Sequence, residues 1–255
     1  MVTESPPLLE ARGLVKHFGA VEALRDGNFE LRPNELHALV GDNGAGKSTM
    51  VKIFSGAHRP DAGELRFDGH LVTIPNPLAA RAIGVTTVYQ DLALVNHLDV
   101  SGNLFLGHEL RLPAPLSWLG FIDKKAMRRR AADEMRRLRV DITSVDQPVL
   151  GLSGGQRQAV AVGRAISWGT RIVILDEPTA ALGVRESRVA LELIHELPSQ
   201  GFSVIMISHN LSEVFAIADR ITILRLGRTI ATVVRAETSV ERVVGLITGA
   251  FEVGV

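Results

Sequence analysis

Short apolar runs recur along the chain, and each ends in glycine or charged residues. The runs at residues 35–40 and 172–175 lead into "GDNGAGKST" and "DE" respectively. Continuous apolar runs of about four to eight residues bounded in this way are typical of buried strands. Between the two runs, Met50, Ile53 and Phe54 repeat at helical spacing. The alternation of buried strands with helices predicts a parallel α/β core.

The same pattern continues towards the end of the chain. It predicts strands at 84–90, 171–177 and 203–209, helices at 185–201, 210–219 and 238–250, and a hairpin over 220–234. Two helix starts carry the spacing of a capping box, Asn210 with Glu213 and Thr238 with Glu241.

The middle of the chain has a different character. Residues 98–150 are rich in Leu, Arg and Ala, and one helical face there carries Met127, Ala131, Met135 and Leu138. We therefore predict one domain over residues 8–250. Its α/β core with a flanking β subdomain spans 8–97 and 157–250, and an inserted helical subdomain spans 98–156.

Composition narrows the classes of function. The chain of 255 residues carries 28 basic and 28 acidic side chains and no cysteine. A general nucleic-acid binder usually has a basic excess, so nucleic acid is not an expected partner. Without cysteine there is no disulfide framework, Cys-ligated zinc or thiol nucleophile. No apolar run approaches the roughly 20 residues of a membrane helix, and no signal peptide is evident. Any work at a membrane is therefore expected to need a partner.

The segment from Gly41 to Ser48 matches the phosphate-binding pattern G-x-x-x-x-G-K-[ST]. Its glycines let backbone amides curl around phosphate oxygens, Lys47 can reach the β and γ phosphates, and the Ser48 hydroxyl can ligate Mg²⁺. The helix that follows adds its positive N-terminal end. We expect ATP to contact the whole loop: Gly41, Asp42, Asn43, Gly44, Ala45, Gly46, Lys47, Ser48 and Thr49.

Two carboxylates end the predicted strand at 171–177. Asp176 at the tip of a buried strand can hold Mg²⁺, directly or through water. Glu177 follows it and can orient or deprotonate an attacking water. Alone, the pair could equally be a strand that ends in surface acids; beside a phosphate loop, the catalytic interpretation is favoured.

Two polar residues follow other predicted strands. Gln90 could reach the metal or the attacking water, and His209 could hydrogen-bond a γ-phosphate. From the residues alone both are weak candidates, because glutamines at strand ends are mostly solvated and lone histidines are mostly structural.

The segment "LSGGQRQ" shares the features of the phosphate loop. Ser153, Gly154 and Gly155 place small residues, amides and a hydroxyl at a predicted helix start. This start lies in or beside the helical lobe, whereas Lys47 lies in the α/β lobe, so one chain cannot easily wrap both around one nucleotide. We therefore predict a head-to-tail dimer in which each ATP contacts Lys47 of one copy and Ser153 of the other.

These motifs together resemble the ATP-binding cassette ATPases. "GDNGAGKST" is similar to their Walker A loop, "VYQD" to the Q-loop, "LSGGQRQ" to the signature, "RIVILDEP" to Walker B and "ISHN" to the switch histidine. The resemblance implies the P-loop ATPase fold of that family, with Gln156 beside the bound nucleotide. It makes Gln90 and His209 catalytic residues, Gln90 a metal ligand as well, and Phe18 a ring that stacks on adenine.

Within the family, the stretches around the Walker A loop and Q-loop resemble ATPases of bacterial monosaccharide importers. The resemblance implies a permease, a second cassette copy and an external sugar-binding protein as partners, with this chain peripheral on the cytoplasmic face of the membrane. It resembles the single-cassette members of fructose-type import. Gly183 stands where many cassettes carry an aspartate, which leaves any role of an acid there open.

The sequence thus predicts an ATPase that energises uptake of a small sugar. An importer or exporter of another solute stays open, because no chemical necessity in the motifs selects the cargo. A soluble cassette protein acting on nucleic acid or the ribosome is less favoured. The basic helix over residues 123–139 is its one supporting feature, and such a face is usually just solvated.

Overall fold

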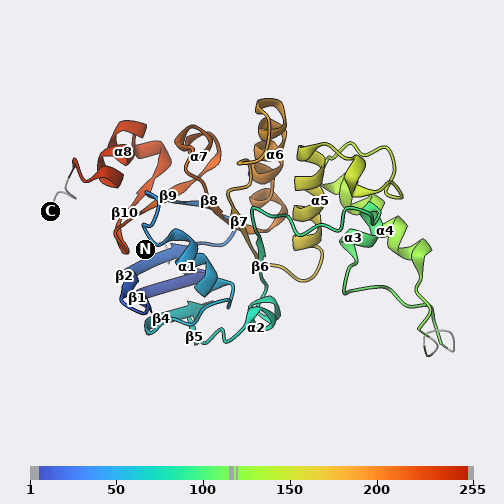
Figure 1. Ribbon diagram of the computed structural model, residues 1–255, viewed down its shortest axis with the longest axis horizontal. Coiled ribbons are helices and arrows are strands. Elements are labelled where there is room, and N and C mark those ends of the chain that lie inside the picture. The colour runs from blue at the N-terminus through green and yellow to red at the C-terminus, as the bar shows by residue number, and fades with distance from the viewer. Residues whose placement is uncertain (1–5, 115–117, 119, 252–255) are drawn as a thin grey trace. The chain divides into compact units, whose positions relative to one another are not determined.

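The computed structural model describes residues 6–114, 118 and 120–251. They form two compact units (Figure 1). Among these residues, the first unit comprises 6–87, 170–178 and 195–251, and the second comprises 88–114, 118, 120–169 and 179–194.

One ten-stranded sheet organises the first unit. Its strand order is β5-β4-β1-β2-β10-β9-β3-β8-β7-β6. The strands are β1 (Leu9–Phe18), β2 (Val21–Leu31), β3 (Leu36–Val40), β4 (Ala62–Phe67), β5 (His70–Val72), β6 (Val85–Val88), β7 (Ile172–Asp176), β8 (Ser203–Ile207), β9 (Arg220–Arg225) and β10 (Arg228–Val234).

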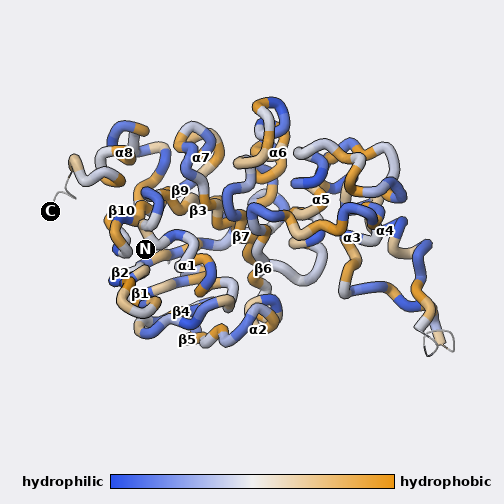
Figure 2. The backbone as a smooth tube through the Cα atoms, viewed as in Figure 1, coloured by the Kyte–Doolittle hydropathy of each residue, from blue (hydrophilic) through white to orange (hydrophobic). Residues whose placement is uncertain are grey.

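The central strands of this sheet are parallel and buried. β3 pairs in parallel with both β8 and β9, and β8 pairs in parallel with β7. Every residue of β3 and β8 is buried, and Figure 2 shows hydrophobic residues gathered along β3 and β9. This burial explains why the strands read as continuous apolar runs. The parallel α/β core predicted from the sequence is confirmed.

An antiparallel arm extends the sheet. β1 pairs antiparallel with β2 and β4, and β4 with β5. A single parallel pair, Arg228 with Asp26, joins the arm to β10. β9 and β10 form the expected hairpin, and positive φ angles of 48° and 78° at Leu226 and Gly227 match the turn favoured between two adjacent strands.

Helix α1 (Lys47–Phe54) lies between the arm and the parallel strands. Its buried residues Met50, Ile53 and Phe54 pack in one cluster with residues of β1, β2, β7 and β8. Figure 1 shows α7 and α8 across the parallel strands from α1. The other helices of this unit are α2 (Pro77–Ala82), α7 (Leu211–Ile217), α8 (Val240–Thr248) and the 3₁₀ turns η3 (Pro198–Gln200) and η4 (Arg235–Glu237).

The second unit is helical. Its elements are α3 (Val100–Leu104), α4 (Lys124–Arg137), η2 (Val149–Gly151), α5 (Gly154–Ile166) and most of α6 (Val184–Glu196). Met127, Ala131 and Met135 are the buried residues of α4, as the helical spacing predicts. The unit is larger than the predicted subdomain 98–156, because α5 packs on α3 and α4 and its apolar face belongs with theirs.

One predicted helix start is wrong by one residue. Ser239, not Thr238, caps α8, and its side chain accepts a hydrogen bond from the Arg242 N–H. Thr238 already ends the preceding turn η4. Two neighbouring hydroxyl residues offer the same capping chemistry, so the pattern alone could not choose between them.

Candidate functional site

The phosphate-binding loop lies in the first unit, between β3 and α1. Gly46 is the N-cap of α1, with a φ of 106°, and Lys47 begins the helix. Gly41 has a φ of 149°, and a Cβ there would lie 2.1 Å from the carbonyl oxygen of Leu224. Only glycine fits this backbone, so the first glycine of the pattern is required by packing as well as by conformation.

Lys47 is buried at the base of the loop. Its Nζ donates to the carbonyl oxygens of Gly41 and Asp42, at 2.6 and 3.0 Å. Burial lowers the pKa of the Lys47 ammonium, and the negative charges of Glu177, Asp42 and Asp176 oppose that shift. The ammonium is therefore poorly solvated, and an anionic ligand would stabilise its charge further.

Asp176 and Glu177 lie at the carboxyl end of β7. Glu177 has a φ of 52°, a left-handed conformation that is costly for a residue with a side chain and clusters at functional sites. Burial and the neighbouring Glu177 charge raise the pKa of Asp176. A carboxylate pair held in this way gains from a nearby cation.

His209 meets Glu177 across two adjacent strands. The Glu177 N–H donates to the Ile207 carbonyl oxygen at the end of β8, at 3.0 Å. His209 follows that strand end, and its Nδ1 lies 2.7 Å from the Glu177 Oε2. The imidazole is largely exposed, whereas the Glu177 carboxylate is mostly covered. The histidine therefore contacts a carboxylate whose charge also acts on Lys47 in the phosphate loop.

The donors around the loop fit a Mg²⁺ ion that is shared with a nucleotide. Among the described residues, no group of three or more His, Cys, Asp or Glu side chains could hold a metal by itself. Ser48 in α1 and Asp176 offer oxygen ligands, and Mg²⁺ in proteins is typically held by one or two carboxylates together with substrate phosphates and water. Two adjacent carboxylates at the end of β7, Asp176 and Glu177, are an arrangement that a cation would stabilise, in line with the raised pKa of Asp176.

Phe18 ends β1 and is 44% exposed. Its ring contacts His58 edge-on, with centroids 5.1 Å apart, and the Lys16 ammonium lies 5.6 Å from its centroid. An exposed aromatic ring that is fixed by its neighbours can accept a stacked base. The contact between Phe18 and adenine stays a prediction.

In the second unit, Ser153 caps α5 through a full capping box. Its Oγ accepts from the Gln156 N–H at 3.3 Å, and the Gln156 Oε1 accepts from the Ser153 N–H at 2.9 Å. The first N–H groups of a helix have no partner within it. Gly154 lies close to Leu182, and Gly155 is buried against Glu186. The helix start predicted from "LSGGQ" is present, and its contact with a nucleotide stays a prediction.

Gln90 follows β6 and is exposed. It belongs to the second unit, together with Ser153–Gln156, whereas Lys47, Asp176, Glu177 and His209 belong to the first. The contacts of the first unit bring those last four together. A joint site with Gln90 or Ser153 stays a prediction.

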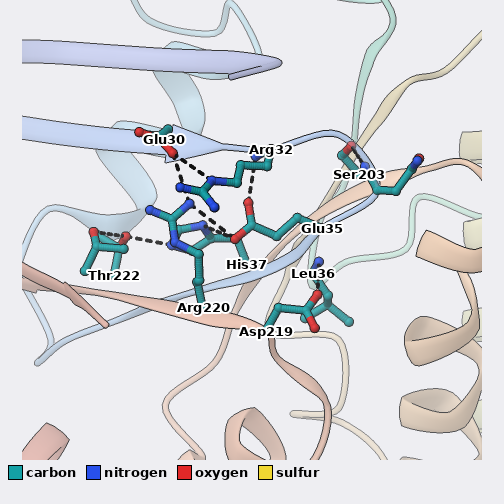
Figure 3. A network of polar contacts seen from close by, with 11 residues as sticks. Glu30, Arg32, Glu35, Leu36, His37, Ser203, Asp219, Arg220 and Thr222 are labelled. Carbon is teal, nitrogen blue, oxygen red and sulfur yellow. Dashed lines mark hydrogen bonds and ion pairs between the residues drawn. The ribbon is translucent and has the colours of Figure 1, made fainter. Parts of the chain in front are cut away.

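A buried polar network at the start of β3 was not predicted. Figure 3 shows Glu35, His37 and Arg220 in contact. His37 Nε2 lies 2.7 Å from the Thr222 Oγ1, and its Nδ1 lies 3.4 Å from the Glu35 carboxylate. Burial lowers the pKa of His37, although the Glu35 charge opposes the shift. His37 has no recognisable motif around it, so its contacts with Thr222 and Glu35 could be found only from the fold.

A loop with the phosphate-binding pattern, a strand-end carboxylate pair and a histidine in contact with one carboxylate are typical of a P-loop nucleotide-hydrolysing protein. The protein-family model described as ABC transporter matches residues 24–180. The chain belongs to the ABC transporter family, and the predicted family, fold class and ATPase activity are confirmed.

Curated relatives match almost the whole chain. A fructose import ATP-binding protein of Rhizobium meliloti is 47% identical over 248 residues, covering 96% of this chain and 95% of the relative. A xylose/arabinose import ATP-binding protein of Sulfolobus acidocaldarius is 43% identical and covers 94% of each. A putative ribose/galactose/methyl galactoside import ATP-binding protein of Burkholderia lata is 41% identical, and the chain spans 47% of its length.

Solved structures share the fold. A nucleotide-free ATP-binding cassette from an ABC transporter superposes with a TM-score of 0.80 at 23% identity, covering 94% of this chain and 98% of that one. A dimeric cassette in a post-hydrolysis state, bound to ADP and Pi, has a TM-score of 0.72 at 22% identity and covers 89% and 98%. In the described part of this chain, no helix combines the length and apolarity needed to cross a bilayer.

Proposed function

We propose that this chain hydrolyses ATP to energise a membrane permease for uptake of a small sugar. The observation that carries the proposal is the contact between His209 and Glu177 at the ends of two neighbouring strands, in a chain whose near full-length relatives are named for sugar import. The contact supports ATP hydrolysis, and the relatives support a sugar as the class of cargo.

Lys47 binds the nucleotide. Its Nζ exchanges the carbonyls of Gly41 and Asp42 for the β and γ phosphates, which carry more negative charge and favour the ammonium more strongly. The partial positive charge at the start of α1 adds to this binding. Phe18 stacks on the adenine and orients the base.

Ser48 and Asp176 would hold Mg²⁺ together with the phosphates, and Gln90 would complete its ligands. When bound, the ion supplies charge stabilisation to the transferring phosphoryl group. Asp176 then stays ionised despite its burial, because a cation favours the charged form of a carboxylate.

Glu177 is the general base. It takes a proton from the attacking water, and its fixed backbone aims the carboxylate at one place. His209 orients that carboxylate through Nδ1, and its other ring nitrogen, Nε2, forms a hydrogen bond with the γ-phosphate. Both groups come from one unit, so their geometry is already set before a partner copy arrives.

Two copies enclose each nucleotide head to tail. The N-terminal amides of α5, capped at Ser153, then face the γ-phosphate from the second copy, with Gly154, Gly155 and Gln156 in the contact. Charge stabilisation from both sides lowers the barrier in the way an added cation would. Closure driven by ATP and opening after hydrolysis give two states that a permease can follow.

The remaining partners follow from this cycle. A permease dimer would contact the region near Gln90, and an external sugar-binding protein would deliver the cargo. The chain would then lie on the cytoplasmic face of the membrane as a peripheral subunit. Nucleic acid is not a proposed partner.

Purification of the tagged chain from its own cells tests the proposal. We expect it to carry a multi-spanning permease, and we expect ATP hydrolysis by that complex in vesicles to rise when a sugar and its binding protein are present. A chain that hydrolyses ATP but binds no membrane protein, and whose deletion leaves sugar uptake unchanged, would refute the transport part of the proposal.

A further inference from the structure

The turn that follows Gln90 is held by hydrogen bonds from α5, the helix that Ser153 caps. Arg164, near the other end of α5, donates from Nη1 to the Ala93 carbonyl oxygen and from Nη2 to the Leu92 carbonyl oxygen, both at 2.8 Å. A planar guanidinium that bonds two adjacent carbonyls fixes orientation as well as distance. All these residues belong to the second unit.

The turn at residues 91–93 is also held in one conformation by contacts within its own segment. Ala93 has a φ of 50°, and its N–H donates to the Asp91 Oδ1 at 3.2 Å. The fully buried Asn103 binds the next part of the chain, since its side chain accepts from the Val95 N–H and donates to the Val95 carbonyl oxygen. Residues 91–98, which we call the clamped segment, therefore have little freedom of their own.

Helix α5 is suited to transmit a displacement. It has thirteen residues, so it spans about 20 Å, and its capping box stabilises the Ser153 end. At Gly163, an added Cβ would lie 2.7 Å from Met135 and 3.2 Å from Leu138. The helix thus packs tightly against α4 and its end, and the two ends of α5 are rigidly related.

We propose that Arg164 is a positioning residue that makes the clamped segment and the Ser153 end of α5 move as one body. The inference rests on the proposed function, in which ATP binds the Ser153 end and a permease binds near Gln90. Val95 and Leu98 in the clamped segment are 40% and 37% exposed, so they form an apolar surface that the permease can contact. Arg164 then joins the partner's movement to closure on the nucleotide.

Hydrogen exchange of the full chain tests this coupling without a permease. The background is Glu177→Gln, with and without ATP and Mg²⁺. Arg164→Lys keeps the charge but loses the two-pronged geometry. Arg188→Lys is the matched control, because Arg188 is an exposed residue of the same unit and its ion pair, within the described part of the chain, is with Glu192.

We expect ATP to slow exchange in peptides covering both residues 153–157 and the clamped segment. In Arg164→Lys, ATP still slows exchange at residues 153–157 but no longer slows it in the clamped segment. With ATP, the clamped segment then exchanges at least roughly tenfold faster than in the background, as expected for the loss of a charged hydrogen bond. Arg188→Lys behaves like the background. A purely local role for Arg164 would accelerate exchange with and without ATP equally and leave the ATP response intact.

Two results would overturn the inference. In the first, Arg164→Lys keeps the ATP response of the clamped segment. In the second, ATP slows exchange at residues 153–157 of the background but never in the clamped segment. In either case Arg164 does not couple the two regions, and the head-to-tail dimer is unaffected. If the background shows no ATP response at 153–157, the proposed enclosure of ATP is wrong and the inference falls with it.

Discussion

Replacing Glu177 by glutamine isolates the general base. The amide has the same shape as the carboxylate and can still accept the 2.7 Å contact with His209, so the fold and the strand-end geometry stay intact. What it loses is the ability to take a proton. Because Lys47, Asp42 and the loop are untouched, the nucleotide should bind at least as tightly as in the parent, with one negative charge fewer near its phosphates.

The expected loss follows from that single change. Removing a general base costs about 10²–10⁴-fold in rate, which corresponds to roughly 2.7–5.5 kcal/mol of transition-state stabilisation. Steady-state phosphate release measures kcat, and equilibrium binding of a fluorescent ATP analogue measures affinity. We expect kcat to fall by that factor and the dissociation constant to change little.

A matched control separates chemistry from surface charge. Glu192→Gln makes the same chemical change at an exposed position of α6, where the carboxylate forms an ion pair with Arg188, and it should hydrolyse ATP at the parent rate. Hydrolysis by Glu177→Gln at the parent rate would refute the assignment of Glu177 as base. A parallel loss of nucleotide binding would show that its role is structural.

Three further predictions test the fold around the site. Gly41→Ala should abolish nucleotide binding and lower the melting temperature, because its Cβ would lie 2.1 Å from the Leu224 carbonyl oxygen; isothermal titration and thermal melts check this. Below the ordinary imidazole pKa of 6.5, the unfolded chain takes up a proton that buried His37 resists, so stability should fall as pH falls, and His37→Gln should flatten that slope in melts recorded from pH 7.5 to 5. Ser239→Ala should destabilise the protein by about 0.5–2 kcal/mol in urea unfolding, and Thr238→Ala by less; the reverse order would contradict the observed cap.

The parts of the site that depend on local sequence could be predicted. The phosphate loop needs glycines, a lysine and a hydroxyl at fixed spacing, and Asp176 and Glu177 end an apolar run that can only be a buried strand. In each of these patterns, all the residues that the chemistry needs lie within about ten residues of chain. The fold class followed because buried parallel strands read as continuous apolar runs.

The contacts between distant segments could not be predicted. Nothing near Arg164 in the sequence points to the carbonyls of Leu92 and Ala93, because the acceptors are backbone atoms with no side-chain signature. The pairing of His37 with Thr222 joins strands that are far apart in the chain. Adjacent capping candidates such as Thr238 and Ser239 are separated only by where the preceding turn ends.

The central claim is that two chains enclose one nucleotide, and mixing two inactive variants tests it most directly. Lys47→Met disables the phosphate loop, and Ser153→Glu places a negative charge where the second copy should meet the γ-phosphate. In a mixed head-to-tail pair, one site contains both changes and the other contains neither. We predict that the mixture hydrolyses ATP well above either variant alone. Activity no higher than the average of the separate variants would contradict the account.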